Sequence, residues 1–113
     1  MEGFNPKEKI KAFKIEYKEE EYLKFPSPHY LNRYAQLVLD LMDKMQSFEV
    51  TMINSIYFIK HDLKNLIADI DGNLNHDYQK RNLRYLSKWR TEKSRLDSIS
   101  SKFLEAVENY KNK

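Results

Sequence analysis

The sequence predicts an all-α protein built around a long antiparallel helical hairpin. Its 113 residues include only two glycines and three prolines, and all three prolines lie within the first 28 residues. The rest of the chain therefore has almost no residue that interrupts a helix. From residue 31 onward, apolar residues recur at alternating spacings of three and four, which is typical of a heptad seam. The length favours a single domain.

Residues 1–27 are predicted to form an N-terminal segment that ends in a break. Three apolar residues after Pro6 fit one helical face: Ile10, Phe13 and Tyr17. The same stretch also alternates apolar and charged residues as a strand would, and we favour the helix, with Pro6 in its first turn. At the break, Ser27 suits an N-cap and Pro28 suits the first position of the next helix.

The first long helix is predicted over residues 28–74. Its seam runs through Leu31, Tyr34, Val38, Leu41, Met45, Phe48, Met52, Ile56, Ile59, Leu63, Leu66, Ile70 and Leu74. The step from Met52 to Ile56 is a stutter, which unwinds a coiled coil locally, and a break at residues 47–51 stays open as an alternative. Unbroken, this helix would be about 70 Å long at 1.5 Å per residue.

A turn is predicted at residues 72–77, where Gly72 is surrounded by Asn and Asp, with Asp77 as N-cap of a second long helix. The apolar positions of that helix are Tyr78, Leu86, Trp89, Leu96, Ile99, Phe103, Val107 and Tyr110. The hairpin of residues 28–113 would leave part of its seam uncovered. We therefore expect two copies to dock as a homodimeric four-helix bundle.

Composition excludes several classes of chemistry. The chain has no cysteine, which excludes disulfides, thiol nucleophiles and cysteine-based zinc sites. Its three histidines lack metal-ligand spacing, so neither a metal nor a cofactor is expected. No apolar run approaches the length of a membrane span and no leader pattern begins the chain, so a cytoplasmic location without membrane contact is expected.

The segment that could carry chemistry is His61-Asp62-Leu63-Lys64-Asn65, inside the first long helix. With Ile59 and Leu66 at heptad position d and Leu63 at a, His61 falls at f, which points away from the seam. An imidazole at that position should face water. Its neutral form is a nucleophile that can attack phosphorus.

This segment resembles the H-box of the dimerisation and histidine-phosphotransfer domain of two-component sensor histidine kinases, in which His is followed by an acid, an aliphatic residue, a base and Asn or Thr. It is similar also to the sporulation phosphorelay phosphotransferase, which has His-Asp, a later Asn and a Gly-Asn-Leu run, here residues 72–74. Residues 95–97, with Ile99 and Phe103, are similar to the stretch with which the second helix of the family packs on the first. The resemblance covers roughly residues 50–110.

The resemblance implies that His61 accepts a phosphoryl group, that Asp62 orients the imidazole and helps to take its proton, and that Asn65 positions water. The family often has proline where this chain has Leu66, which implies a straighter helix here. The glycine-rich ATP-binding boxes of a sensor kinase are absent, so autophosphorylation is not expected. The implied partner is a response-regulator receiver domain that supplies its own Mg²⁺. A fragment of a longer kinase stays an alternative.

Basic residues are predicted to help a receiver domain to dock. Residues 1–75 hold 10 Lys and Arg against 12 Asp and Glu, whereas residues 76–113 hold 10 against 5. Four cations are spaced as one stripe on the predicted second helix: Arg81, Arg84, Lys88 and Arg95. Such a stripe would complement the carboxylates of a receiver. With Tyr57 and Lys64 beside His61, the residues Arg81, Arg84 and Lys88 make up the predicted docking set; a solvated helix face is the alternative.

Three other interpretations stay open or are set aside. The first is a non-catalytic helical interaction protein, such as an adaptor, an inhibitor or an immunity-type partner. The second is a monomeric histidine-phosphotransfer domain, since residues 61–64 are similar to its His-x-Leu-Lys, although its usual Gly is Asn65 here. Nucleic-acid binding is not expected, because interleaved acidic residues dilute the positive charge.

Overall fold

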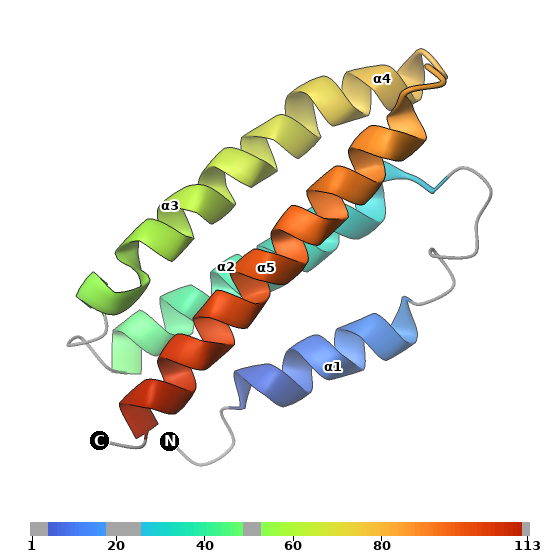
Figure 1. Ribbon diagram of the computed structural model, residues 1–113. Helices are drawn as coiled ribbons and strands as arrows, with labels where there is room; N and C mark the ends of the chain where they lie inside the picture. The colour runs from blue at the N-terminus through green and yellow to red at the C-terminus, as the bar shows by residue number, and fades with distance from the viewer. Residues whose placement is uncertain (1–4, 18–25, 49–52, 112–113) are drawn as a thin grey trace.

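Only helices and turns occur in the residues that the structure describes, so the all-α fold class is confirmed. The structure is a computed structural model, and it describes residues 5–17, 26–48 and 53–111. The elements are α1 (Pro6–Glu16), α2 (Pro28–Phe48), α3 (Ile53–Asp69), the π-helical turn η3 (Ile70–Leu74), α4 (Asn75–Gln79) and α5 (Tyr85–Lys111). Figure 1 shows α3, η3 and α4 as one continuous helical path.

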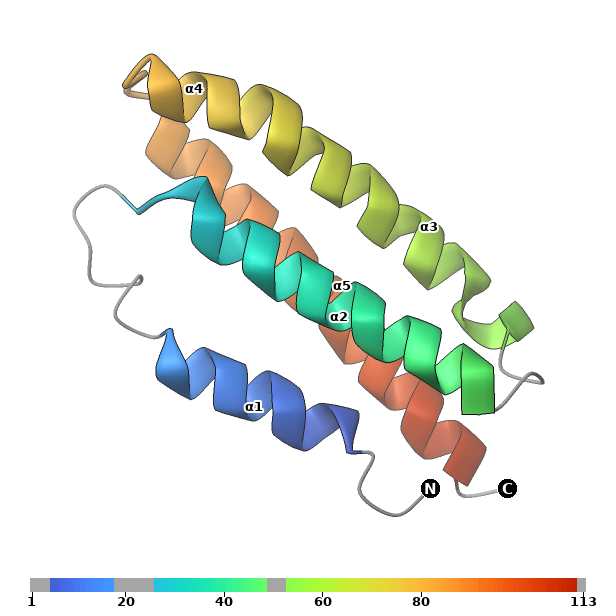
Figure 2. The ribbon, with the colours of Figure 1, turned by 180° about the vertical axis from the view of Figure 1, so that it is seen from behind.

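Three long helices lie side by side and α1 covers one of their faces. α3 runs antiparallel to both α2 and α5, which run in the same direction (Figure 1). Figure 2, from behind, shows α1 on the side of α2 and α5 that lies away from α3. The overall dimensions are 47 × 25 × 17 Å.

The helix predicted over residues 28–74 is two helices in the structure. α2 ends at Phe48, α3 begins at Ile53, and the predicted break falls on residues 49–52, which lie outside the described residues. The stutter of the seam falls at this junction. Because α3 folds back along α2, both halves of the seam bury one another within one chain. The long two-helix hairpin expected from the sequence is therefore replaced by three packed helices.

The turn predicted at residues 72–77 is wrong, because the chain stays helical to Gln79. Asp77 does not begin a helix; it is 8% exposed within α4 and pairs with Lys88 of α5. The turn comes at residues 80–84 as a Schellman motif, in which Arg81 N–H donates to Tyr78 O and Asn82 N–H donates to Asp77 O, both at 3.1 Å. Arg81 takes the left-handed position of this motif, with a φ of 52°.

The core joins α2, α3 and α5 through most of the residues that the seam predicted, together with Tyr30 and Tyr85, which the seam did not include; the predicted Ile59, Tyr78, Leu86 and Tyr110 are only partly buried. The largest side chains with less than 2% exposure include Tyr30, Tyr34, Leu41, Met45, Ile56, Leu63, Leu66, Tyr85 and Phe103. Tyr34 Oη donates to Asp97 Oδ1 at 3.0 Å, and burial raises the pKa of the Tyr34 hydroxyl above its ordinary value. Trp89 Nε1 donates to Ser27 O at 3.2 Å, which holds the start of α2 against α5.

The helix predicted in the N-terminal segment is confirmed as α1. Pro6 occupies its first turn, and the Asn5 side chain accepts from Glu8 N–H at 3.2 Å as an N-cap. The predicted face points inward: Ile10 is buried, and the ring of Phe13 lies 5.6 Å from that of Tyr30. In the described part of the chain, α1 thus packs as a further helix on α2 and on the core that α2 forms with α3 and α5.

A cross-linking experiment tests the antiparallel packing of α2 on α3. Lys60 Nζ lies 2.5 Å from Asp43 Oδ1, whereas the same residues would be about 26 Å apart along one straight helix. In the cysteine-free chain, we expect Asp43→Cys/Lys60→Cys to form an intramolecular bridge with a short bis-maleimide, read by mass spectrometry. Either single variant serves as the control. A product in which each cysteine carries its own reagent molecule, with no bridge between the two, would contradict this packing.

Candidate functional site

His61 lies at the midpoint of α3 and faces solvent. Ile56, Leu63 and Leu66, on the inner face of α3, are each 0% exposed. At 100° per residue, His61 points away from the direction that these three share, and its side chain is exposed. The prediction of a water-facing imidazole is therefore confirmed.

The two predicted partners of His61 lie near it in α3 but are not hydrogen-bonded to it. Asp62 and Asn65 are both exposed. Asp62 lies on the flank of α3 that faces α5, where its charge acts on Arg95. Among the described residues, no hydrogen bond joins His61 to Asp62 or Asn65. Their roles in orienting the imidazole and positioning water stay predictions.

The turn of α3 that precedes His61 carries an anchoring lysine and two exposed aromatic residues. Lys60 donates to Gln46 Oε1 at 2.8 Å in addition to its ion pair with Asp43, so it fixes α3 to α2. Tyr57 is 58% exposed and Phe58 is 74% exposed. Their ring centroids lie 5.3 Å apart at an interplanar angle of 86°, an edge-to-face pair one turn before His61.

The predicted docking residues do not form one surface. Tyr57 and Lys64 lie on the outer face of α3 with His61, whereas Arg81 and Arg84 lie in the turn after α4. That turn is about 30 Å from His61 along the helix. The predicted stripe on one helix is wrong, because α5 begins only at Tyr85.

The two cations of the stripe that do belong to α5 are tied to acidic side chains. Lys88 pairs with Asp77. Arg95 Nη1 lies 2.8 Å from Asp69 Oδ2 and 3.4 Å from Glu92 Oε2. The Lys88–Asp77 and Arg95–Asp69 pairs join α5 to the path of α3, η3 and α4, so they serve packing between helices, whereas the Arg95–Glu92 pair lies within α5.

Comparison with known proteins adds no relative. The chain matches no protein-family model, no curated protein and no solved structure. The phosphotransfer hypothesis therefore stands on the His61 motif and on the outer face of α3.

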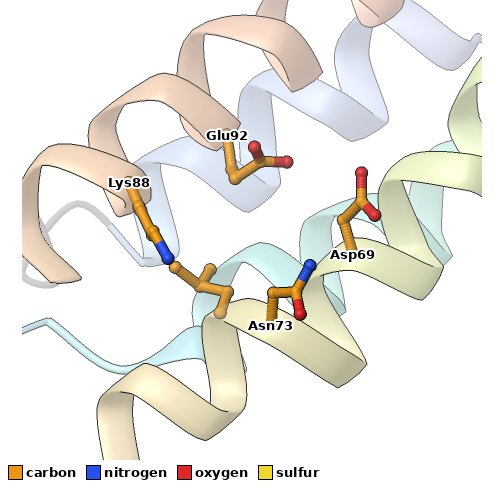
Figure 3. Close-up of a pocket in the computed structure, with 5 residues that line it drawn as sticks. Asp69, Asn73, Lys88 and Glu92 are labelled. Atoms are coloured by element: carbon orange, nitrogen blue, oxygen red, sulfur yellow. The ribbon is translucent and has the colours of Figure 1, made fainter. Parts of the chain in front are cut away.

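Sequence reasoning missed a polar cluster between α3 and α5. Asp69, Asn73, Leu74, Lys88 and Glu92 line a cavity of about 220 Å³. In Figure 3 Asp69 and Glu92 extend their carboxylates into this space from opposite helices. The only sequence signal was the spacing of charges at i, i+3 in α5, which also fits a solvated face.

Burial within this cluster raises the pKa of the Glu92 carboxyl above its ordinary value of 4.5. Arg95 opposes this shift and Asp69 adds to it. The pKa of Arg95 is raised chiefly by its hydrogen bond to Asp69, so the guanidinium stays charged. Desolvation of Glu92 thus outweighs its pairing with Arg95.

Glu92→Gln is expected to stabilise the protein at neutral pH. The folded state holds the Glu92 proton more tightly than the unfolded state, so the stability of the wild type falls as pH rises above 4.5, whereas the variant carries no titrating group here. The thermal midpoint of the variant should exceed that of the wild type at pH 7, and the difference should shrink at about pH 3.5. An equal difference at both pH values would contradict the raised pKa.

Two general features of the described ranges bear on function. They contain no group of three His, Asp or Glu side chains that could hold a metal ion. Within the same ranges, every helix lacks the length or the apolar character needed to cross a lipid bilayer.

Proposed function

We propose that the outer face of α3 is a protein-docking surface and that His61 is its phosphoacceptor in histidine phosphotransfer with a receiver domain of a two-component or phosphorelay pathway. The observation that supports this proposal is an exposed imidazole at the midpoint of α3, one turn from the exposed Tyr57–Phe58 pair. A cytoplasmic location is part of the proposal, because receiver domains act there.

The proposed reaction requires an open approach to the imidazole. An unprotonated ring nitrogen of His61 attacks the phosphorus of an aspartyl phosphate in line with the bond that breaks. The phosphorus–nitrogen bond forms as the phosphorus–oxygen bond breaks, and the receiver carboxylate leaves with the electron pair. The proton on the other ring nitrogen passes to water or to Asp62. In this proposal the receiver supplies the Mg²⁺, and the transfer requires no cofactor bound to this chain.

The homodimer predicted from the seam stays a prediction. Since α2, α3 and α5 bury their seam residues within one chain, a dimer would have to form through exposed side chains. Near His61, the apolar ones are Tyr57 and Phe58. Static light scattering tests this directly: twice the chain mass of 13.7 kDa supports the homodimer, and 13.7 kDa contradicts it.

Transfer of radiolabel tests the phosphotransfer function. The full chain is incubated with ³²P-phosphorylated receiver domains encoded in the same genome, and the proteins are separated by electrophoresis. We expect label on this chain that survives alkali and is lost in acid, as a phosphorus–nitrogen bond requires. Absence of label with every receiver would overturn phosphotransfer.

A non-catalytic interaction protein is the second candidate, favoured by one observation. Phe58 is 74% exposed beside Tyr57, while no hydrogen bond among the described residues orients His61. An aromatic pair of this kind suits a binding anchor, and a nucleophile without an orienting partner is poorly prepared for transfer. Partner binding that depends on Tyr57 and Phe58 but leaves no label on His61 would select this candidate.

A further inference from the structure

The turn between α4 and α5 carries features that packing of the helices does not require. Leu83 is 96% exposed, and Arg81 holds a φ of 52° without being glycine. Residues 78–91 contain five Lys and Arg and no Asp or Glu. The left-handed Arg81 belongs to the Schellman motif that ends α4. What that motif does not account for is an almost fully exposed leucine in a stretch of sequence that is otherwise strongly basic.

Backbone and side-chain hydrogen bonds hold this turn in one shape. Asn82 N–H donates to Asp77 O at 3.1 Å, which closes the Schellman motif before Leu83. Arg84 N–H donates to Asn82 Oδ1 at 2.9 Å, and Tyr85 N–H donates to Asn82 O at 3.0 Å, which starts α5 after it. Leu83, which is 96% exposed, therefore lies in a fixed turn. Figures 1 and 2 show the turn between α4 and α5 at one end of the elongated molecule.

The charge around Leu83 is positive and largely uncompensated. Lys80 and Arg84 are exposed, and neither has an ion-pair partner in the described part of the chain. Asp77 is the one acidic residue between positions 72 and 91, and it is already paired with Lys88. Lys80 and Arg84 are thus two exposed cations that flank Leu83 in the sequence of the turn.

We propose that this turn, residues 80–84, docks on an anionic lipid surface, with Leu83 inserted at the acyl boundary and Lys80 and Arg84 against lipid phosphates. Cations near an anionic bilayer are attracted to it, and an inserted leucine leaves water. A nucleic-acid backbone would use the cations but offers no apolar layer for Leu83. A turn at the end of a narrow molecule reaches a flat surface without hindrance from the other helices. The proposal is independent of the chemistry at His61.

Co-sedimentation with vesicles tests the proposal on the full chain. We expect binding to phosphatidylcholine vesicles that contain phosphatidylglycerol, and none to phosphatidylcholine alone. Leu83→Ser should weaken partitioning about tenfold, and Lys80→Glu/Arg84→Glu about 100-fold or more. The matched controls are Ile15→Ser, at an apolar side chain 62% exposed on α1, and Lys102→Glu on α5. Circular dichroism checks that each variant is folded.

A fluorescent probe tests insertion of residue 83 directly. Because the chain has no cysteine, Leu83→Cys can carry a polarity-sensitive dye at a single site, with Lys102→Cys as the control. We expect a blue shift on anionic vesicles at residue 83 only. The proposal is overturned by absence of vesicle binding, by equal binding of Leu83→Ser and the wild type, or by binding to a DNA or RNA duplex without binding to vesicles.

Discussion

His61→Gln is expected to abolish phosphoryl labelling of the chain while leaving its fold intact. Gln offers no nitrogen with a free electron pair for attack on phosphorus, so the loss should be complete rather than partial. The imidazole is exposed and makes no hydrogen bond among the described residues, so its replacement should change the free energy of unfolding by less than about 0.5 kcal/mol. Autoradiography and thermal unfolding measure the two effects.

The other two histidines provide matched controls for this variant. His29 and His76 are also exposed, and His29→Gln and His76→Gln should each keep full labelling. If label persists in His61→Gln and disappears in His29→Gln or His76→Gln, the phosphoacceptor is not on α3.

Asp62→Asn is expected to slow transfer by about 100-fold if its carboxylate assists removal of the proton.

Leu66→Ala is expected to lower the free energy of unfolding by about 2–5 kcal/mol. Leu66 is 0% exposed, and it belongs to the core that joins α3 to α2 and α5. A domain of this size has about 5–15 kcal/mol of stability, so the variant should lose a large part of it. Urea unfolding followed by circular dichroism gives the value. Lys64→Ala, on the exposed face of the same helix, should change it by less than about 0.5 kcal/mol.

A loss below about 1 kcal/mol in Leu66→Ala would contradict its burial between the helices. A loss of similar size in Lys64→Ala would place the outer face of α3 against other parts of the chain. That outcome would also remove the surface on which docking at His61 depends.

The sequence predicted the buried positions well and their connection poorly. Tyr34, Leu63 and Leu66 are buried as the seam requires, because the spacing of apolar residues specifies which face of a helix avoids water. The same spacing does not specify whether that face meets another chain or another part of its own. The fold-back of α3 along α2 needed only the few residues around the stutter, and a stutter predicts local unwinding rather than a reversal.

The end of the α3 path was misplaced because local preference gave way to packing. Gly72 and its polar neighbours favour a turn by composition, yet they form the π-helical turn η3, and Ile70 and Leu74 stay buried on either side. The turn in the structure has Arg81 at the left-handed position of the Schellman motif, where glycine is usual. The residue types at this point of the sequence therefore did not predict a turn. Exposure of His61 followed from its heptad position, whereas the pairing of Arg95 with Asp69 needed the relative placement of two helices.

Ion pairs on the two flanks of α3 restrict rotation of the helix about its own axis. Lys60 pairs with Asp43 of α2 on one flank, and Asp69 pairs with Arg95 of α5 on the other. Rotation of α3 about its axis in either direction would break one of these two ion pairs and would expose the buried Leu63 and Leu66. The direction in which the imidazole of His61 faces is thus set by the orientation of α3 rather than by a hydrogen bond to its ring. A partner protein can therefore contact this imidazole without a rotation of α3.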